Sequence, residues 1–329
     1  MDKQSINWIL TDSRIGSNNQ AIALAEELGL NYRIIKLEYN IIAKLPNWII
    51  PLNFIQVKSP NILELLKQET PDLIISASRR TAIVSASIKK RVQNVKNIQI
   101  LRPDLSFSNF DLVILPQHDK NIANKYDNVY RIIGALNNVN KKISDTLLDF
   151  ERIYSEFTKN KYAVVLIGGN TKSFSFDKKS SSELHETLLN LIQYNNIKYF
   201  ITYSRRTPDV VKEALKPLQN EGHIIYDPTT DASFNPYPAM LEKASFVVST
   251  IDSVSMSSEV ASTGKPFYLH IPRGFNSGKH LTFAYQLSDL GIAKLINNDN
   301  NHLQEYNYTC LNEVRKVADY ILSSILSVK

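Results

Sequence analysis

The stretch STIDSVSMSSEVASTGKP, residues 249 to 266, combines hydroxyl groups at the start of a predicted helix with a carboxylate about one and a half turns into it. Ser253 suits a helix N-cap, and a glycine and a proline end the pattern. The first N–H groups of a helix lack intrahelical partners and attract phosphate. Ser253 and Ser255 would therefore bind phosphate, while Glu259 would accept hydrogen bonds from a ribose diol. An ordinary βα unit with a surface glutamate is the alternative interpretation.

Two further loops carry groups suited to a nucleoside diphosphate. Gly168-Gly169-Asn170 follows an apolar strand, as a phosphate-binding turn does, because glycine lets the backbone approach a ligand closely. Arginines that follow another strand can form paired hydrogen bonds with phosphate. Neither GxGxxG nor the Walker pattern occurs, which argues against a nicotinamide site and a P-loop. The predicted nucleotide-binding residues are Gly168, Gly169, Asn170, Ser204, Arg205, Arg206, Ser253, Ser255 and Glu259.

The first half of the chain would then bind the acceptor. Asp12, in the loop TDSRIGSNNQ, is placed to take a proton from an attacking hydroxyl, although a turn or N-cap role is the alternative. His118 is the competing base, because imidazole titrates near neutral pH, and its alternative is a polar surface residue. The sequence contains no cluster of histidines and carboxylates that would predict a metal site. The predicted acceptor-binding residues are Arg14, Gly16, Asn19, Arg79 and Arg80.

Strands alternate with helices along the whole chain, which predicts an α/β protein with two doubly wound, Rossmann-like domains. Charge gathers at residues 158 to 161, so we expect an N-terminal domain over 1–157 and a C-terminal domain over 158–310. A final helix over 311–329 would pack back toward the N-terminal domain. Ser180 and Glu183 form a capping-box pair that predicts another helix start.

A four-residue motif is repeated in equivalent places in the two halves of the chain. Ser78-Arg79-Arg80-Thr81 and Ser204-Arg205-Arg206-Thr207 both follow a strand and both open a helix. Threonine is a good N-cap and arginine is common at surfaces, so chance is the alternative. Ligands bind beyond the carboxyl ends of parallel strands, and we therefore expect the two domains to face each other across one cleft.

Composition narrows the functional classes. The net charge is +6, but no basic tail or zinc-ligand spacing occurs, so anionic ligands or anionic lipid are favoured over nucleic acid. A single cysteine, Cys310, excludes an intramolecular disulfide and fits a reducing compartment. No signal-peptide core and no run of roughly 18 apolar residues is present. We expect a cytoplasmic protein, with peripheral contact to the inner membrane.

Residues 41 to 58, IIAKLPNWIIPLNFIQVK, are rich in aliphatic residues, and two prolines prevent a long helix. Core packing is one interpretation. The other is an interfacial segment, in which Trp48 lies at headgroup depth while Lys44 and Lys58 reach anionic phosphates. An exposed apolar patch here would help to draw a lipid-linked acceptor from a bilayer. The second interpretation predicts reversible, salt-sensitive contact with an anionic membrane.

The motifs TDSRIGSNNQ, SASRRT, LPQHD, IGGN, TYSRRTP, NPYPAML and TIDSVSMSSEVASTGKP together resemble the mitochondrial-fission "elongated mitochondria" family. The resemblance spans about residues 8 to 270, although Ser13 and Ser17 depart from the family's usual TDGRAGNENQ loop. Bacterial members are read as glycosyltransferases of the GT-B type, and plant members as peripheral outer-membrane proteins that recruit a dynamin. The layout is also distantly similar to the peptidoglycan N-acetylglucosaminyltransferase and lipid A disaccharide synthase. These resemblances imply nucleotide binding by Gly168, Gly169, Ser253, Ser255 and Glu259.

These sequence features are compatible with three functions. The first is a glycosyltransferase that moves a sugar from a nucleoside-diphosphate sugar to a cell-envelope lipid or glycan, without a metal or other cofactor. The second is a nucleotide-sugar epimerase, because the same fold and nucleotide site serve both reactions. The third is a non-catalytic, membrane-associated adaptor that binds a protein partner. An epimerase would interconvert its sugar without an acceptor, and an adaptor would bind no nucleotide.

Overall fold

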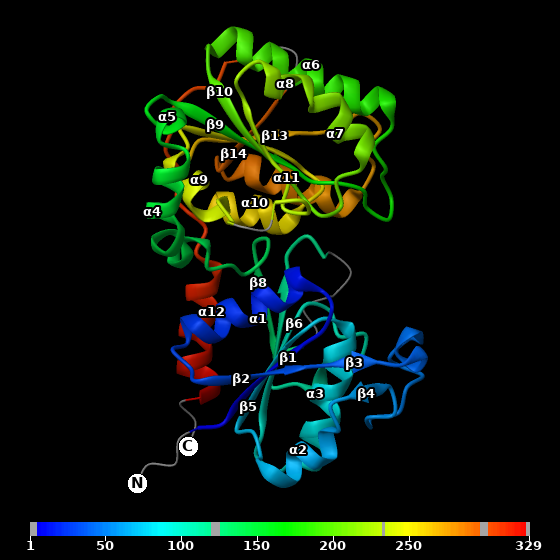
Figure 1. The fold of residues 1–329 in the computed structure, drawn as a ribbon. Coiled ribbons are helices and arrows are strands. Elements are labelled where there is room, and N and C mark those ends of the chain that lie inside the picture. Colours follow the sequence, from blue (N-terminus) through cyan, green and yellow to red (C-terminus); the bar gives the residue numbers. More distant parts are fainter. Residues whose placement is uncertain (1–4, 120–125, 232–233, 297–301, 327–329) are drawn as a thin grey trace. The chain divides into compact units, whose positions relative to one another are not determined.

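The chain divides into two compact units. The computed structural model describes residues 5–119, 126–231, 234–296 and 302–326. The N-terminal unit comprises Met1–Asn137 and Asn312–Lys329, and the C-terminal unit comprises Asn138–Leu311. Each unit contains a six-stranded sheet with helices packed on it (Figure 1).

The sheet of the N-terminal unit is parallel throughout, in the order β2-β1-β5-β6-β7-β8. Strands β1, β5 and β7 are buried along their full length. Helices cover both faces, which explains why these strands are mostly apolar. The strands are β1 (Asn7–Thr11), β2 (Tyr32–Lys36), β5 (Leu73–Ala77), β6 (Lys96–Ile100), β7 (Leu112–Pro116) and β8 (Val129–Ile132). The helices are α1 (Ile15–Glu27), α2 (Ile62–Gln68), α3 (Arg79–Arg91) and α12 (Glu313–Ile321), with the short 3-10 helix η2 (Phe107–Asn109) and the π-helix η4 (Leu322–Leu326).

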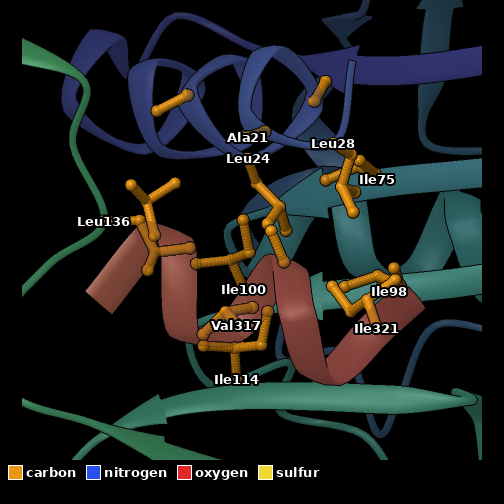
Figure 2. Close-up of a cluster of buried hydrophobic side chains, with 14 of the residues drawn as sticks. Ala21, Leu24, Leu28, Ile75, Ile98, Ile100, Ile114, Leu136, Val317 and Ile321 are labelled. Carbon is orange, nitrogen blue, oxygen red and sulfur yellow. The ribbon is translucent and has the colours of Figure 1, made fainter. Parts of the chain in front are cut away.

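The C-terminal helix α12 completes one face of this sheet. Figure 2 shows Val317 and Ile321 of α12 against Leu24 of α1 and the strand residues Ile100 and Ile114. The Glu313 carboxylate also accepts a hydrogen bond from the backbone N–H of Ile133 (2.9 Å). Helices α2 and α3 supply a second apolar cluster with the other strand faces. The N-terminal unit is therefore built from both ends of the chain.

A two-stranded antiparallel ribbon is inserted between β2 and α2. Its strands are β3 (Glu38–Tyr39) and β4 (Val57–Ser59), and the turn η1 (Ile41–Lys44) begins the connection between them. This connection extends away from the six-stranded sheet (Figure 1). It contains the apolar segment with two prolines, which forms no long helix, as expected.

The C-terminal unit repeats the parallel design, in the order β11-β10-β9-β12-β13-β14. Helices α6 to α8 lie on one side of this sheet and α9 to α11 on the other (Figure 1). The strands are β9 (Tyr162–Ile167), β10 (Lys198–Tyr203), β11 (Ile224–Tyr226), β12 (Phe246–Thr250), β13 (Phe267–His270) and β14 (Ala293–Leu295). The other elements are η3 (Val139–Lys142), α4 (Ile143–Ile153), α5 (Ser155–Thr158), α6 (Lys178–Asn195), α7 (Asp209–Leu215), α8 (Pro217–Asn220), α9 (Tyr237–Lys243), α10 (Val254–Ala261) and α11 (Gly278–Asp289).

Two boundaries differ from the expected ones. The units divide after residue 137, and not after 157, because α4 packs on the C-terminal unit, where the Phe150 and Phe200 ring centroids are 5.7 Å apart. Helix α6 begins earlier than expected, because Asp177 and Ser180 form its capping box.

Among the described residues, no helix is both long enough and apolar enough to cross a membrane.

Candidate functional site

Three loops meet at the carboxyl edge of the C-terminal sheet, after β9, β10 and β12. The first three N–H groups of the loop after β9, here called the β9 loop, donate to protein acceptors. Gly168 donates to Thr250 Oγ1 (2.8 Å), Gly169 to Asp252 Oδ2 (2.5 Å) and Asn170 to the Arg206 carbonyl (3.1 Å). These hydrogen bonds tie the β9 loop to the neighbouring loops.

The glycines of this loop are required by close packing. A Cβ on Gly168 would overlap the Asp252 carboxylate, and a Cβ on Gly169 would overlap the Arg206 backbone. From the sequence, these glycines were expected to let the backbone approach a phosphate. In the structure their N–H groups donate to protein acceptors instead, so the β9 loop packs closely against the loops that contain Arg206 and Asp252. We call this contact between the three loops the packed joint.

Asp252 and Arg206 form the centre of this joint. The Asp252 side chain is fully buried, and its Oδ1 has no hydrogen-bond partner among the described residues. Arg206 Nη2 lies 4.0 Å from Asp252 Oδ2, and Arg206 Nη1 donates to the Asn170 carbonyl (3.2 Å). Arg205 and Arg206 are both exposed. Arg206 therefore braces the loops while 49% of its side-chain surface stays accessible to solvent.

Helix α10 starts as the sequence predicts. Ser253 is its N-cap, and Ser253 Oγ accepts a hydrogen bond from the Met256 N–H (3.4 Å). The partly buried Ser255 lies in the first turn. The N–H groups of that turn before Met256 have no intrahelical partner, so the helix offers donors to an anion.

Glu259 lies further along α10 and is held by Tyr237. The Tyr237 hydroxyl donates to Glu259 Oε2 (2.7 Å). Burial raises the pKa of Glu259 to about 7, although the Tyr237 hydrogen bond and Lys142 act in the opposite direction. Glu259 thus changes charge near neutral pH. Tyr237 was missed as a functional residue, although it lies within the motif NPYPAML.

His280 is a second residue that the sequence did not indicate. Its Nδ1 lies 2.6 Å from Ser277 Oγ, and its ring meets Phe275 edge-on. Burial lowers the pKa of His280, while Asp252 opposes this effect. The lowered pKa favours the neutral imidazole, and the charge of Asp252 acts on this ring. No sequence signal marked it, because a single histidine in a helix is usually a surface residue.

In the N-terminal unit, Asp12 is buried and each of its carboxylate oxygens accepts a hydrogen bond. Its Oδ1 accepts a hydrogen bond from the Arg14 N–H (2.8 Å), and its Oδ2 accepts one from Ser78 Oγ (3.1 Å). Asn18 bonds both the N–H and the carbonyl of Asp12. These contacts hold the β1 loop against the start of α3. Arg14 on the same loop is exposed, as are Gly16 and Asn19 at the start of α1.

The adjacent arginines of α3 differ in their surroundings. Arg79 donates to the carbonyls of Leu45 and Ala43, and so supports the β3–β4 connection. The Nε of Arg80 is buried without a hydrogen-bond partner among the described residues, as is the hydroxyl of Tyr39. The guanidinium of Arg80 lies 5.8 Å from the centroid of the Tyr39 ring. Among the described residues Arg80 therefore keeps an unused donor at Nε, whereas Arg79 is engaged by the β3–β4 connection.

His118, the other candidate base, is buried in the loop after β7. Strands β5 and β6 lie between β7 and the strand that carries Asp12. The two candidate bases thus follow different, non-adjacent strands.

Other features lie apart from the predicted residues. An open pocket of about 710 Å³ runs along α6 in the C-terminal unit. It is lined by Lys178, Lys179, Ser182, Glu183, Glu186, Thr187, Asn190 and Arg273. Within the described ranges, no three histidine, cysteine, aspartate or glutamate side chains are grouped to hold a metal ion.

Relatives share sequence along most of the chain. The family model for mitochondrial fission ELM1 matches residues 15–325. The uncharacterized protein RP120 of Rickettsia prowazekii is 39% identical over 345 residues, which cover 95% of this chain and 97% of that protein. The mitochondrial fission protein ELM1 of Arabidopsis thaliana is 24% identical over 278 residues, which cover 78% of this chain and 64% of that protein.

Solved structures share the fold at low sequence identity. The UDP-GlcNAc 2-epimerase of Methanocaldococcus jannaschii matches with a TM-score of 0.61 and 14% identity, covering 97% of this chain and all of that one. Its complex with UDP-GlcNAc and UDP matches with a TM-score of 0.54, 15% identity and the same coverage. A glycosyltransferase of Rickettsia africae matches with a TM-score of 0.52 and 15% identity, covering 98% of this chain and 89% of that one. These likenesses confirm two doubly wound Rossmann-like domains of the GT-B type.

Proposed function

The chain belongs to the mitochondrial fission ELM1 family, and from that premise we propose that it transfers a sugar from a nucleoside-diphosphate sugar to a cell-envelope lipid or glycan. The observation that carries the proposal is the start of α10, where a serine-capped first turn precedes the Glu259–Tyr237 pair. Proteins of the same fold bind UDP-GlcNAc and UDP, which supports a nucleotide-sugar donor. The donor is a substrate, and no metal or other cofactor is invoked.

In the proposed donor site, the first turn of α10 binds the diphosphate. Ser253 and Ser255 lie at this turn, and the exposed Arg205 supplies positive charge from the neighbouring loop. The Glu259 carboxylate accepts hydrogen bonds from the ribose diol. In this arrangement Gly168, Gly169, Asn170, Ser204 and Arg206 contribute by holding the loops in place.

In the proposed acceptor site, the N-terminal unit binds the hydroxyl that attacks the sugar. Arg80 is the better anchor than Arg79, because its Nε is buried and unpaired among the described residues, whereas Arg79 supports the β3–β4 connection. Asp12 is the proposed base, and His118 is the reserve candidate. We place the protein in the cytoplasm, at the inner membrane, where envelope acceptors are made.

The second candidate function is epimerisation of the nucleotide sugar. It is favoured by the likeness to UDP-GlcNAc 2-epimerases and by the neutral His280 near Asp252, which is a potential proton acceptor. Incubating the protein with a nucleotide sugar and no acceptor separates the two reactions. An epimerase interconverts the sugar under these conditions, whereas a transferase gives only slow hydrolysis.

The first experiment is a thermal-shift screen with UDP, GDP, CDP, ADP and CMP. A ligand at a hundred times its Kd stabilises the protein by roughly 2.7 kcal/mol, which such a screen resolves. Glu259→Ala should then weaken binding of the selected nucleotide by roughly 1.5–3 kcal/mol. Glu156→Ala is the matched control, because that side chain is 84% exposed on α5. If no nucleotide binds, an adaptor that binds a protein partner replaces the enzyme.

A further inference from the structure

We propose that the connection between β3 and β4 is a docking surface for an anionic lipid bilayer. Five large apolar side chains of this connection are exposed: Ile41 (75%), Leu45 (45%), Trp48 (77%), Ile49 (50%) and Ile55 (54%). We call these five residues the apolar surface. No other stretch of similar length in the described chain exposes so many large apolar side chains. Core packing is therefore not their role.

Hydrogen bonds and core packing fix the backbone that carries the apolar surface. Arg79 donates to the carbonyls of Ala43 and Leu45, and the buried Asn47 donates to the carbonyls of Arg79 and Pro103. Ile50 is buried among the core residues of the N-terminal unit. The exposed side chains thus project from anchored backbone, so little conformational entropy is lost when they enter an interface.

The charge of the connection fits an anionic bilayer. Lys44 of the connection and Lys58 of β4 are exposed, and no acidic residue occurs between Glu38 and Glu64. The whole chain carries a net charge of +6. Tryptophan and lysine among aliphatic side chains are typical of segments that lie in the headgroup region. A second copy of the same surface would instead bring lysines together.

The location of the two tryptophans makes the proposal directly testable by fluorescence. Trp8 is fully buried, and its indole N–H donates to Glu69 (2.7 Å), so it does not respond to a membrane. Trp48 is the exposed one. With vesicles of equal parts phosphatidylglycerol and phosphatidylcholine, we expect a blue shift, protection from acrylamide quenching and co-sedimentation. Higher salt or phosphatidylcholine alone should reduce all three.

The test variants remove apolar area or charge without disturbing the fold. Ile41→Ser together with Ile49→Ser should weaken vesicle binding at least tenfold, or about 1.4 kcal/mol, while Trp48 remains as the reporter. Lys44→Gln together with Lys58→Gln should remove most of the salt dependence. Leu148→Ser is the matched control, because Leu148 is 80% exposed in the C-terminal unit.

Several outcomes would overturn the proposal: wild-type protein left in the supernatant at low salt, equal binding by the double serine variant, or an equal loss in the Leu148→Ser control. A dimer that the double serine variant dissociates, with no vesicle binding, would assign the surface to a second copy. The proposal does not depend on the catalytic one, since vesicle binding is measured without nucleotide or acceptor.

Discussion

The Tyr237–Glu259 hydrogen bond should set the pH range over which nucleotide binds. A protonated Glu259 would lose one of its acceptor positions for the ribose diol, so tight binding requires the ionised form. The pKa of Glu259 is raised to about 7 by burial, and the Tyr237 hydroxyl opposes that rise. Tyr237→Phe removes the donor and leaves the ring, so the pKa of Glu259 should increase further.

The size of the effect follows from the strength of the bond. A hydrogen bond to a charged group contributes ~1.5–3 kcal/mol, and the partial exposure of Glu259 favours the lower end. Because about 1.4 kcal/mol corresponds to one pH unit, the midpoint should move upward by about one unit. At pH 7 the ionised fraction then falls from about a half to about a tenth, and nucleotide affinity falls about fivefold.

The assay is calorimetric titration of the nucleotide selected by the thermal-shift screen, between about pH 6 and pH 9. The variant should bind more weakly than the wild type at neutral pH and recover its affinity at the alkaline end. Tyr285→Phe is the control, because Tyr285 is half-exposed on α11. If Tyr237→Phe and the wild type give the same pH profile, Glu259 does not bind the nucleotide as an ionised carboxylate held by Tyr237.

Three further results are expected. Glu259→Gln should raise the free energy of unfolding by about 1–3 kcal/mol above pH 7 and have no effect below the unfolded pKa of Glu, because a raised folded-state pKa makes ionisation destabilising; urea denaturation at both pH values measures this. Gly169→Ala should destabilise the C-terminal unit by about 1–3 kcal/mol through overlap with the Arg206 backbone, whereas Gly278→Ala, which meets open space, should not. Asp12→Asn should slow sugar transfer about 10²–10⁴-fold without changing nucleotide affinity, and a normal rate in a transfer assay would leave His118 as the base.

Much of the fold could be predicted because its signals are local. Apolar runs such as Tyr162–Ile167 and Phe246–Thr250 are short and bounded by polar loops, so they were recognisable as buried strands. Ser253 could be recognised as an N-cap for the same reason. The unit boundary was misplaced because the charged residues near 158 are a local signal, whereas the packing of Phe150 on Phe200 is not.

The roles of individual site residues were harder to predict, because partners distant in sequence decide them. A Gly-Gly turn after a strand suits a phosphate as well as a packed joint, and only the position of Asp252 distinguishes the two. Arg79 and Arg80 are identical in type and adjacent, yet the carbonyls of the β3–β4 connection engage one of them. Pattern alone could not reveal that Tyr237 holds Glu259.

The place of α12 has a consequence for biosynthesis. The sheet of the N-terminal unit is translated first, but the face that includes Leu24 and Ile100 stays uncovered until Val317 and Ile321 have left the ribosome. Until α12 is synthesised, a nascent chain therefore exposes the apolar residues of this face. Holding chaperones should bind this face during translation, and a stop codon shortly before α12 should yield an aggregating product even though the strands of both six-stranded sheets are intact.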